Sequence, residues 1–257
     1  MRIKNAVLPV MLIFSSEILS FHQTLTRVNV TNIPAWNQPC GSPEGRTKYH
    51  RVVVDKNTWG RQLSRSLRKI RHQLNVTLEH IKNQTLNESY SEIRKDVERH
   101  RHVPSWVPGM GNVLILYSGR WTRLQISSYL PKLHTELQTF CVALEAIVED
   151  SADLSLVVDT NTHLIEFLCE VEEALIVLQI AVPVPRVQRS LMSDEERNPP
   201  DETKRLVRDW GVLTKYRDYL HYWSLLLSKM ENHQKKHKAK NRTARRRHEQ
   251  NSNNHKS

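Results

Sequence analysis

The sequence predicts an all-α chain whose central part, residues 55–230, folds as a four-helix bundle. Apolar residues recur at steps of three and four residues in four separate segments, which is the pattern of amphipathic helices. Glycine is scarce, with 7 residues in 257, so folds that depend on many tight turns are disfavoured. The connections between the four segments are long, short and long. This order favours an up-up-down-down bundle over an up-down-up-down bundle, which needs only short connections.

The first two predicted helices cover residues 55–81 and about 117–149. Asp55, Asn57 and Thr58 are each able to cap the first one. The second contains Pro131, where we expect a kink or a late start, because proline disrupts a helix interior. Prolines and glycines at residues 104–111 separate the two helices. Their apolar stripes are Trp59, Leu63, Leu67, Ile70, Leu74, Leu78 and Ile81, and then Leu130, Leu133, Leu137, Phe140, Leu144 and Ile147.

The third and fourth predicted helices are separated by a long polar connection that ends at Pro199-Pro200. The third follows a short break at about residues 150–160 and is expected to stop at Pro183. Asp201 is a suitable cap for the fourth, whose broad apolar surface, including Trp210, is wide enough to be buried on two sides. The apolar positions are Leu164, Leu168, Val171, Leu175 and Leu178, and then Leu206, Trp210, Leu213, Tyr216, Tyr219, Leu220, Trp223, Leu226, Leu227 and Met230.

The segments outside the bundle differ in composition. Residues 1–20 have a basic start, an apolar run and small residues at their end, which predicts a secretory signal peptide cleaved after Ser20. The alternative is an apolar N-terminal element of a cytosolic protein. Residues 21–54 contain scattered prolines and glycines and are expected to be irregular. Residues 231–257 carry nine Lys or Arg and two Glu without an apolar period, so we expect a disordered basic tail.

The chain is strongly basic, with a formal net charge of +11. Such chains bind polyanions, whether nucleic acid, acidic lipid or sulfated glycans. A secreted chain meets the sulfated glycans of the extracellular matrix, and the tail then holds the candidate heparin-binding residues. The tail is otherwise a solubilising end, or a processing site for proteases at Arg245–Arg247. The candidate heparin-binding residues are Lys235, Lys236, Lys238, Lys240, Arg245, Arg246 and Arg247.

Acceptor motifs for N-linked glycans support secretion. Three of them are packed between residues 75 and 89, so we expect that stretch to present a solvated face that no receptor contacts. The five acceptor residues are Asn29, Asn75, Asn83, Asn87 and Asn241.

The three cysteines, Cys40, Cys141 and Cys169, leave one thiol over or one bridge to another chain. The sequence midpoint of Cys141 and Cys169 lies in the short connection between the second and third helices. In an antiparallel hairpin the two would lie at similar heights, which suggests a disulfide between them. The alternative is a pair of buried free cysteines.

No pattern of catalytic or cofactor-binding residues is present. Glycine-rich phosphate loops, nucleophile elbows and the metalloprotease motif do not occur in the sequence. His233 and His237 have helical metal-ligand spacing but lie in the basic tail without a neighbouring carboxylate or cysteine cluster. We therefore expect a non-enzymatic protein with no cofactor, no metal and no small-molecule substrate.

Residues 55–230 resemble the long-chain four-helix cytokines. The run Arg208-Asp209-Trp210-Gly211-Val212-Leu213 is similar to the start of the last helix in the LIF, CNTF and interleukin-six group. The second helix is also similar, with Tyr129, Leu130, Leu133, Leu137, Phe140 and Leu144 followed by Glu149-Asp150. The basic character, multiple glycan sites and basic tail resemble the insect unpaired cytokines. The resemblance implies a secreted ligand that clusters a transmembrane cytokine-class receptor and signals through JAK and STAT.

Two sets of receptor contacts are expected. The exposed face of the first helix carries Arg61, Arg65, Arg68 and His72, although an ordinary solvated face has the same composition. In the vertebrate group an aromatic residue and a lysine at the start of the last helix contact the receptor. The corresponding positions here hold Arg205 and Arg208, so the basic character is kept and the aromatic residue is absent.

A different class of function is an intracellular, helical nucleic-acid-binding protein that uses its basic tail as an electrostatic arm. This alternative requires an uncleaved N-terminus. It also makes the clustered glycan motifs a coincidence.

Overall fold

The computed structural model describes residues 33–41, 56–90, 95, 103–109, 122–150 and 155–254, with side chains through most of these ranges as far as Met230. The predicted signal peptide, most of the 21–54 segment and Asn29 lie outside the described residues. The chain divides into two units, Met1–Pro34 and Ala35–Ser257, and all helices described below belong to the second.

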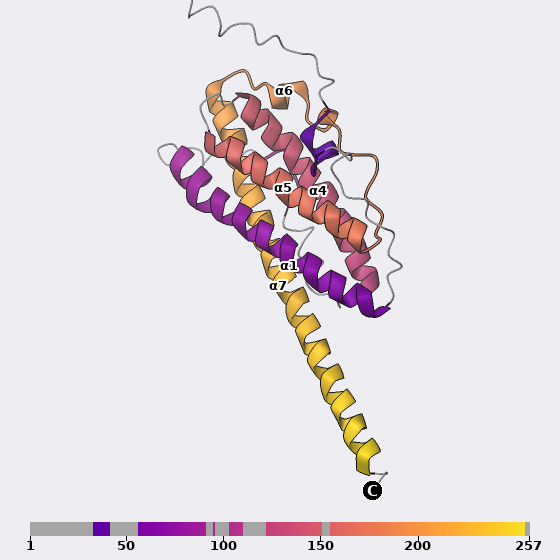
Figure 1. The fold of residues 1–257 in the computed structure, drawn as a ribbon. Coiled ribbons are helices and arrows are strands. Elements are labelled where there is room, and N and C mark those ends of the chain that lie inside the picture. The colour runs from indigo at the N-terminus through magenta and orange to yellow at the C-terminus, as the bar shows by residue number, and fades with distance from the viewer. Residues whose placement is uncertain are drawn as a thin grey trace, which may run out of the picture. The chain divides into compact units, whose positions relative to one another are not determined.

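The described residues form helices and no strand, which confirms the predicted all-α class (Figure 1). Helix α1 is followed directly by a π-helix, η3. Short helical turns η1, η4 and α6 lie in the connecting segments. The four long helices are α1 (Lys56–His80), α4 (Arg123–Asp150), α5 (Ser155–Val177) and α7 (Glu202–Asn254), and the shorter elements are η1 (Ala35–Asn37), η3 (Ile81–Ser89), η4 (Arg189–Leu191) and α6 (Asp194–Arg197).

The predicted apolar stripes meet in one core. Helix α1 packs against α5 and α7, and α4 packs against the same two helices. Leu67 of α1, Leu137 of α4, Leu168 of α5 and Leu220 of α7 are all fully buried. Trp210 is also buried, as its position on the apolar face of the fourth helix predicts. Full burial of a leucine side chain stabilises the fold by about 1.5–3 kcal/mol relative to exposure.

Helix α4 begins at Arg123 because Thr122 and Gln125 form a capping box. The Gln125 amide donates to Thr122 Oγ1 at 3.3 Å, and the Thr122 amide donates to Gln125 Oε1 at 3.0 Å. Pro131 lies inside the helix. The helix therefore starts upstream of the proline and continues through it, so the alternative of a start at Pro131 is wrong.

Helix α5 ends at Val177, before Pro183, where the sequence predicts its end. Gln179 adopts the left-handed conformation, with φ of 57°. The amides of Ile180 and Gln179 donate to the carbonyls of Leu175 at 2.8 Å and Ile176 at 3.1 Å. These two bonds are those of a Schellman motif, which satisfies the last carbonyls of a helix. A local backbone turn, and not the proline, sets the end of α5.

Helix α7 begins with the predicted cap and continues much further than expected. The Lys204 amide donates to Asp201 Oδ1 at 2.7 Å. The helix extends to Asn254, so residues 231–254 are helical where a disordered tail was expected. This stretch contains no glycine or proline and is rich in good helix formers. It also continues a helix already formed, which avoids the cost of nucleation. Residues 231–254 lack the apolar period that packing against a core needs, but the lack of this period does not exclude a helix.

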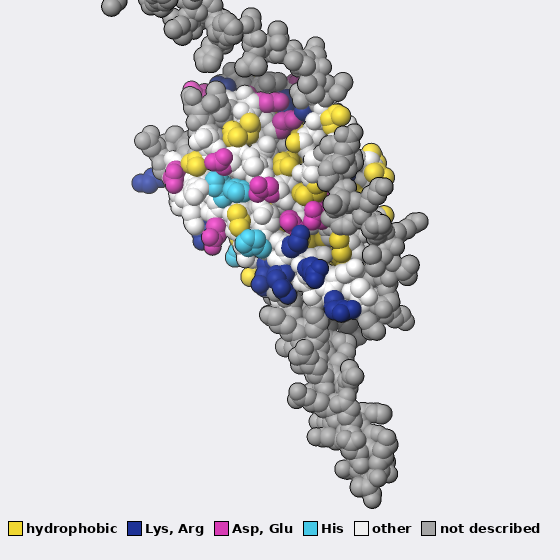
Figure 2. Space-filling model, in the orientation of Figure 1, with side chains coloured by type: hydrophobic (Ala, Val, Ile, Leu, Met, Phe, Trp, Pro, Cys, Tyr) yellow, Lys and Arg dark blue, Asp and Glu magenta, His cyan; other side chains and the backbone are white. Residues whose placement is uncertain are grey.

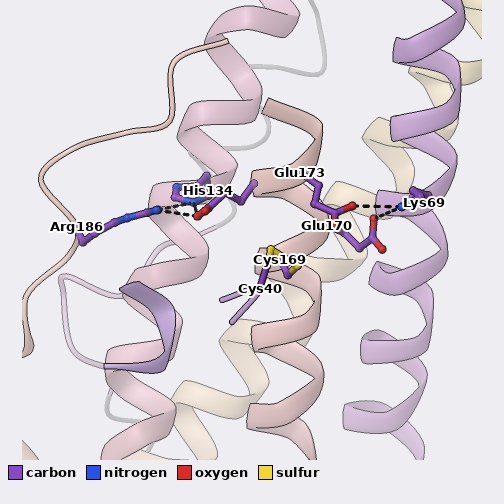
Figure 3. The surroundings of a disulfide bond; sticks show 8 residues. Cys40, Lys69, His134, Cys169, Glu170, Glu173 and Arg186 are labelled. Atoms are coloured by element: carbon purple, nitrogen blue, oxygen red, sulfur yellow. Dashed lines mark hydrogen bonds and ion pairs between the residues drawn. A yellow bond between two sulfur atoms is a disulfide. The ribbon is translucent and has the colours of Figure 1, made fainter. Parts of the chain in front are cut away.

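The disulfide joins Cys40 to Cys169, so the predicted pairing of Cys141 with Cys169 is wrong. Cys141 is a buried free thiol close to Tyr216 of α7. Cys169 is only half-buried and meets the N-terminal segment outside the helices (Figure 3). The sequence midpoint predicts the height of the two cysteines along their hairpin, but not the direction in which each side chain points.

Trp36 fastens the same N-terminal segment to the long connection between α5 and α7. Its indole is 2% exposed, and Nε1 donates to the Val187 carbonyl at 2.8 Å. The guanidinium of Arg189 lies over the ring, 5.7 Å from its centroid. Together with the disulfide, these contacts tie three distant parts of the chain together.

We expect the double variant Cys40→Ser and Cys169→Ser to lose about 2–5 kcal/mol of unfolding free energy, because the bridge closes a very long loop. Urea denaturation measures the loss. Cys141→Ala is the matched control, since it removes a buried thiol and leaves the bridge intact. Peptide mapping without reductant should yield a Cys40–Cys169 peptide, and finding Cys141 in a disulfide would contradict this assignment.

Candidate functional site

An exposed basic face runs along α1. Arg61, Arg65, Arg68 and His72 are all exposed, as the sequence predicts. They follow one another at steps of three or four residues, so they lie on one side of the helix. Lys and Arg side chains gather on the corresponding part of the surface (Figure 2). The structure therefore brings these four candidate receptor contacts together in one surface, called here the α1 basic face.

Acidic side chains of α5 border the α1 basic face. Lys69 Nζ lies 3.3 Å from Glu173 Oε2 and 3.5 Å from Glu170 Oε2 (Figure 3). A groove of about 330 Å³ separates α1 from α5 here, and Arg65 lines it. The charge of Lys69 is thus offset by α5, whereas Arg65 and Arg68 are exposed to solvent. An acidic partner would meet its strongest attraction on the outer side of α1.

A second, apolar groove lies at the start of α7. Its volume is about 470 Å³. Trp106 Nε1 donates to Glu196 Oε1 at 3.1 Å, which holds the segment around Pro104 against α6. Glu196 also completes the capping box of α6 with Ser193. The groove is lined by Pro104, Glu195, Glu196, Pro199, Pro200, Thr203, Lys204, Val207 and Arg208.

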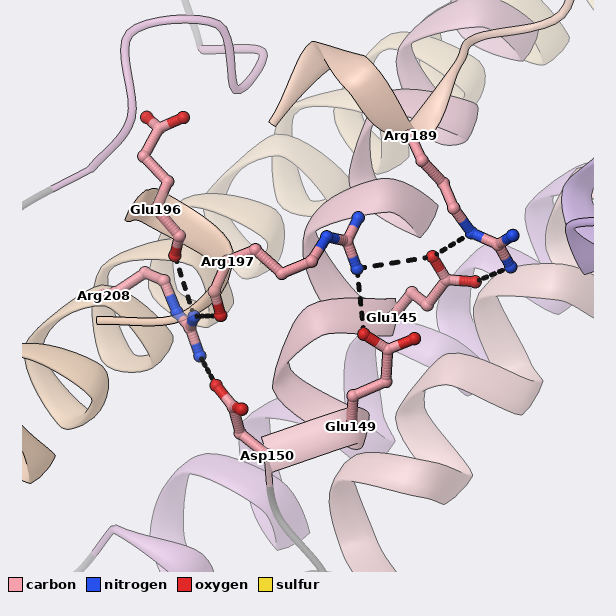
Figure 4. Close-up of polar contacts among 7 residues, drawn as sticks. All are labelled: Glu145, Glu149, Asp150, Arg189, Glu196, Arg197 and Arg208. Atoms are coloured by element: carbon pink, nitrogen blue, oxygen red, sulfur yellow. Dashed lines mark hydrogen bonds and ion pairs between the residues drawn. The ribbon is translucent and has the colours of Figure 1, made fainter. Parts of the chain in front are cut away.

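Arg208 is buried and has a structural role. Its side chain is 3% exposed, and its guanidinium donates to Asp150 Oδ2 at 2.8 Å and to Asp209 Oδ1 (Figure 4). The same group donates to the carbonyls of Glu196 at 2.9 Å and Arg197 at 2.8 Å. Of the two positions taken from the cytokine resemblance, Arg205 is therefore the one that is partly exposed.

Arg208 does not fully compensate the buried charge of Asp209. Burial raises the pKa of the Asp209 carboxyl to about 6, although the Arg208 guanidinium acts in the opposite direction. Asp150 adds a second negative charge and also raises this pKa. The start of α7 thus holds two carboxylates and one guanidinium in a small buried volume. Removing the guanidinium would leave the carboxylates without their cation.

Two further arginines fix the connection between α5 and α7 to helix α4. Arg189 makes a bidentate pair with Glu145, with Nε 2.7 Å and NH2 2.6 Å from its two oxygens (Figure 4). Arg197 NH1 lies 3.0 Å from Glu149 Oε2 and 3.6 Å from Glu145 Oε2. Bidentate arginine pairs are among the stronger charge-assisted contacts, so this connection is held in a defined position.

A buried polar network fixes the same connection nearer its start (Figure 3). His134 is fully buried, with Nε2 3.1 Å from Glu172 Oε2. Arg186 NH2 lies 2.8 Å from the same oxygen. Gln138 continues the network, because its Oε1 accepts from the Val187 amide at 2.8 Å. Burial would raise the pKa of Glu172, but hydrogen bonds from His134 and Arg186 hold it below the ordinary value.

The predicted glycan acceptors in the described part of the chain are exposed. Asn75 lies on α1, and Asn83 and Asn87 lie on η3. Asn75 Oδ1 accepts from Ser224 of α7 at 3.2 Å. The positions of Asn241 and of the candidate heparin-binding residues are helical, but their side chains lie outside the described residues, as does Asn29.

Cys40, Cys169 and Glu173 bring three potential metal-ligand atoms within 4.8 Å of one another. The two sulfurs are joined as a disulfide, so they offer no thiolate to a metal. In the part of the chain that the structure describes, no helix is long and apolar enough to cross a membrane.

Comparisons with protein-family models, with curated proteins and with solved structures find no match to this chain.

The residues that position these surfaces are not evident from the spacing of the sequence. The Pro199-Pro200 pair signals the loop beside the apolar groove, but nothing local indicates that Trp106 reaches Glu196 or that His134 meets Arg186. Both contacts join residues more than 50 positions apart. Only the packing of the helices brings them together.

We expect Arg208→Ala to reduce the free energy of unfolding by about 3–5 kcal/mol, because it leaves buried carboxylates without their cation. Arg205→Ala, three residues earlier on the same helix, should change it by less than about 0.5 kcal/mol. Urea denaturation of both variants measures the difference. Equal effects of the two substitutions would contradict the structural role of Arg208.

We expect Glu172 to make the free energy of unfolding depend on pH in the acid range. Its pKa in the folded state is below the ordinary value of 4.5, so the ionised form contributes stability above that pH. This contribution is lost as the pH falls through the lower, folded-state pKa. Glu172→Gln should therefore differ most from the natural chain at neutral pH, and the two unfolding curves should converge in acid. A difference that stays constant from neutral to acid pH would contradict the pKa assignment.

Proposed function

We propose that this chain is a secreted, non-enzymatic signalling ligand with the up-up-down-down topology of long-chain four-helix cytokines. The observation that carries the proposal is that contacting helices run in opposite directions. Gln73 of α1 is hydrogen-bonded to Glu166 of α5, and His80, later on α1, is hydrogen-bonded to Leu156, earlier on α5. The two helices are therefore antiparallel. Helix α4 approaches α5 through a short connection, Asp150 to Ser155, which also makes neighbours antiparallel.

Contacts with α7 support the same topology. Asn75 contacts Ser224, and Tyr90, later in the chain, contacts Trp210, which is earlier on α7. Helix α7 therefore runs antiparallel to α1. Tyr219 donates to Glu136 at 2.6 Å, and Arg208 meets Asp150 further along α4. The pairs α1 with α4 and α5 with α7 are then parallel. The two long connections are needed because each must cross the length of the bundle.

Secretion is supported by the disulfide and by the exposed glycan acceptors. Disulfides persist in oxidising compartments and are rare in the cytosol. Asn75, Asn83 and Asn87 lie at positions where a glycan does not disturb the core. The predicted signal peptide of residues 1–20 supplies the route to that compartment.

Receptor binding is assigned to two separate surfaces. The α1 basic face suits an acidic receptor surface, and its charges would steer association. The apolar groove at the start of α7 suits a partner with an apolar anchor. Lys204 lines this groove, and the partly exposed Arg205 is the next residue along the helix. Two surfaces on one rigid bundle are able to hold two transmembrane receptor chains together. Such clustering activates JAK and STAT in the cytokines that this chain resembles.

The basic end of α7 gives the ligand a second attachment. Residues 231–254 continue the helix with many Lys and Arg residues and few acidic ones. A basic helix of this kind binds sulfated glycans of the extracellular matrix by charge. We assign it to retention of the ligand near the cells that release it.

The proposal is tested with the chain purified from culture medium. STAT phosphorylation is measured in cells treated with this chain, and the association rate constant is measured for its binding to the receptor. Arg65→Glu should slow association, and the effect should be larger at low salt because surface charges are then less screened. Lys82→Glu is the matched control, since it makes the same charge change at an exposed position among the glycan acceptors. Deletion of residues 231–257 should leave signalling intact and lower the salt needed for elution from heparin.

Intact mass of the product in medium and in cells decides between this proposal and its alternative. A shortened, glycosylated chain in the medium supports a secreted ligand. A full-length, unglycosylated chain confined to cells overturns it and favours nucleic-acid binding, with the basic end of α7 as an electrostatic arm.

A further inference from the structure

Two histidines from neighbouring helices meet away from the candidate receptor surfaces. His80 is the last residue of α1, and His163 lies on α5. Their ring centroids are 4.9 Å apart, with the planes inclined at 62°. His80 is nearly buried, at 9% exposure, and His163 is half-buried. Histidine and acidic side chains also lie near one another on the face shown in Figure 2.

The hydrogen bond of His80 fixes its tautomer. Nε2 lies 3.2 Å from the Leu156 carbonyl oxygen. A carbonyl only accepts, so Nε2 carries the proton and Nδ1 has the lone pair. The carbonyl is itself held in place, because it also accepts from Thr160 Oγ1 at 2.9 Å and from Thr85 Oγ1 at 3.3 Å.

A carboxylate fixes the tautomer of His163. Its Nδ1 lies 3.3 Å from Glu166 Oε2, so Nδ1 carries the proton and Nε2 has the lone pair. Gln73 Nε2 donates to that carboxylate oxygen at 2.8 Å and orients it. Each ring thus has one nitrogen bound to an oxygen acceptor and the other able to act as a ligand.

We propose that His80 Nδ1 and His163 Nε2 bind one divalent transition-metal ion, of the zinc, copper or nickel kind that imidazole favours. Histidines that ligate metals usually donate their other N–H to a carbonyl or a carboxylate, and both forms occur here. With metal–nitrogen bonds of about 2.0–2.1 Å, two imidazoles on one tetrahedral ion have ring centroids about 5 Å apart. The observed 4.9 Å meets this requirement.

Among the described residues, no third histidine, cysteine or carboxylate forms a close ligand group with these two rings, so water completes the coordination. The two imidazoles come from different helices, and the ion would therefore link α1 to α5.

The backbone at this place is unusual in a way that also points to a site. The π-helix η3 begins at Ile81, directly after His80. π-helical segments are rare and occur frequently at functional sites. Thr85 of η3 contacts Thr160 at 2.7 Å as well as the Leu156 carbonyl, so the π-helix helps to build the surroundings that orient His80.

Calorimetric titration of the full-length secreted chain with zinc chloride tests the proposal. We expect one equivalent to bind, and His80→Ala and His163→Ala should each weaken that event by at least about tenfold. Glu166→Gln should weaken it by about 10- to 100-fold, because it acts through the orientation of His163.

Two controls separate this site from other histidines. His72→Ala removes an exposed histidine of the α1 basic face, and the double variant His233→Ala and His237→Ala removes the helically spaced pair near the end of α7. Both should leave the event unchanged. Cobalt gives a second readout, since its visible absorption reports tetrahedral nitrogen and oxygen ligands and should be lost in the His163 variant.

Unchanged zinc affinity in His163→Ala would overturn the proposal. Zinc binding that is lost in the His233 and His237 double variant, but kept in the His80 and His163 variants, would overturn it as well. If His80→Ala does not fold, the half-buried His163 still decides the result. The outcome is independent of receptor binding, because metal binding is measured on the isolated chain.

Discussion

The aromatic face of α7 is the contact on which the arrangement of the other helices depends. Phe140 of α4 lies 4.7 Å from Tyr216 and 5.1 Å from Tyr219, measured between ring centroids. Tyr90, just after η3, lies 5.7 Å from Trp210 in the same way. Aromatic side chains of this size bury about 150–250 Å² each, so they dominate the energetics of a core. These contacts fix α7 against α4 and against the residue that follows η3.

Buried polar groups then determine how the connections lie over this core. The segment carrying Trp36 and Cys40, the arginines of the α5–α7 connection and Arg208 each join parts of the chain far apart in sequence. An apolar core tolerates several arrangements of its loops, whereas a buried charge is stable only when its partner is in place. Of these contacts, the one from Arg208 to the Glu196 carbonyl joins two residues that line the apolar groove at the start of α7.

The exposed features use different side chains, although several of them lie on α1. The α1 basic face, the apolar groove and the His80–His163 pair are built from different residues, while the predicted acceptors Asn75, Asn83 and Asn87 lie on α1 and η3. A bundle is suited to this division, because each helix presents an outer face without affecting the buried one. Surfaces on different helices of one bundle therefore lie at fixed relative positions.

The amino-acid sequence determined the four apolar stripes, the Asp201 cap, the burial of Trp210 and the exposure of Arg65 and Arg68. These features depend on residues within one or two helical turns, and local periodicity therefore predicts them. The partner of Cys169, the burial of Arg208, the end of α5 at Gln179 and the meeting of His80 with His163 were decided by the tertiary structure. A disulfide partner depends on which distant segment a cysteine side chain faces. The contacts of Arg208 and His80 depend on side-chain direction in the same way. The left-handed turn at Gln179 uses a residue type that does not routinely adopt this conformation, so the residue itself does not signal the turn. One-dimensional spacing carries neither kind of information.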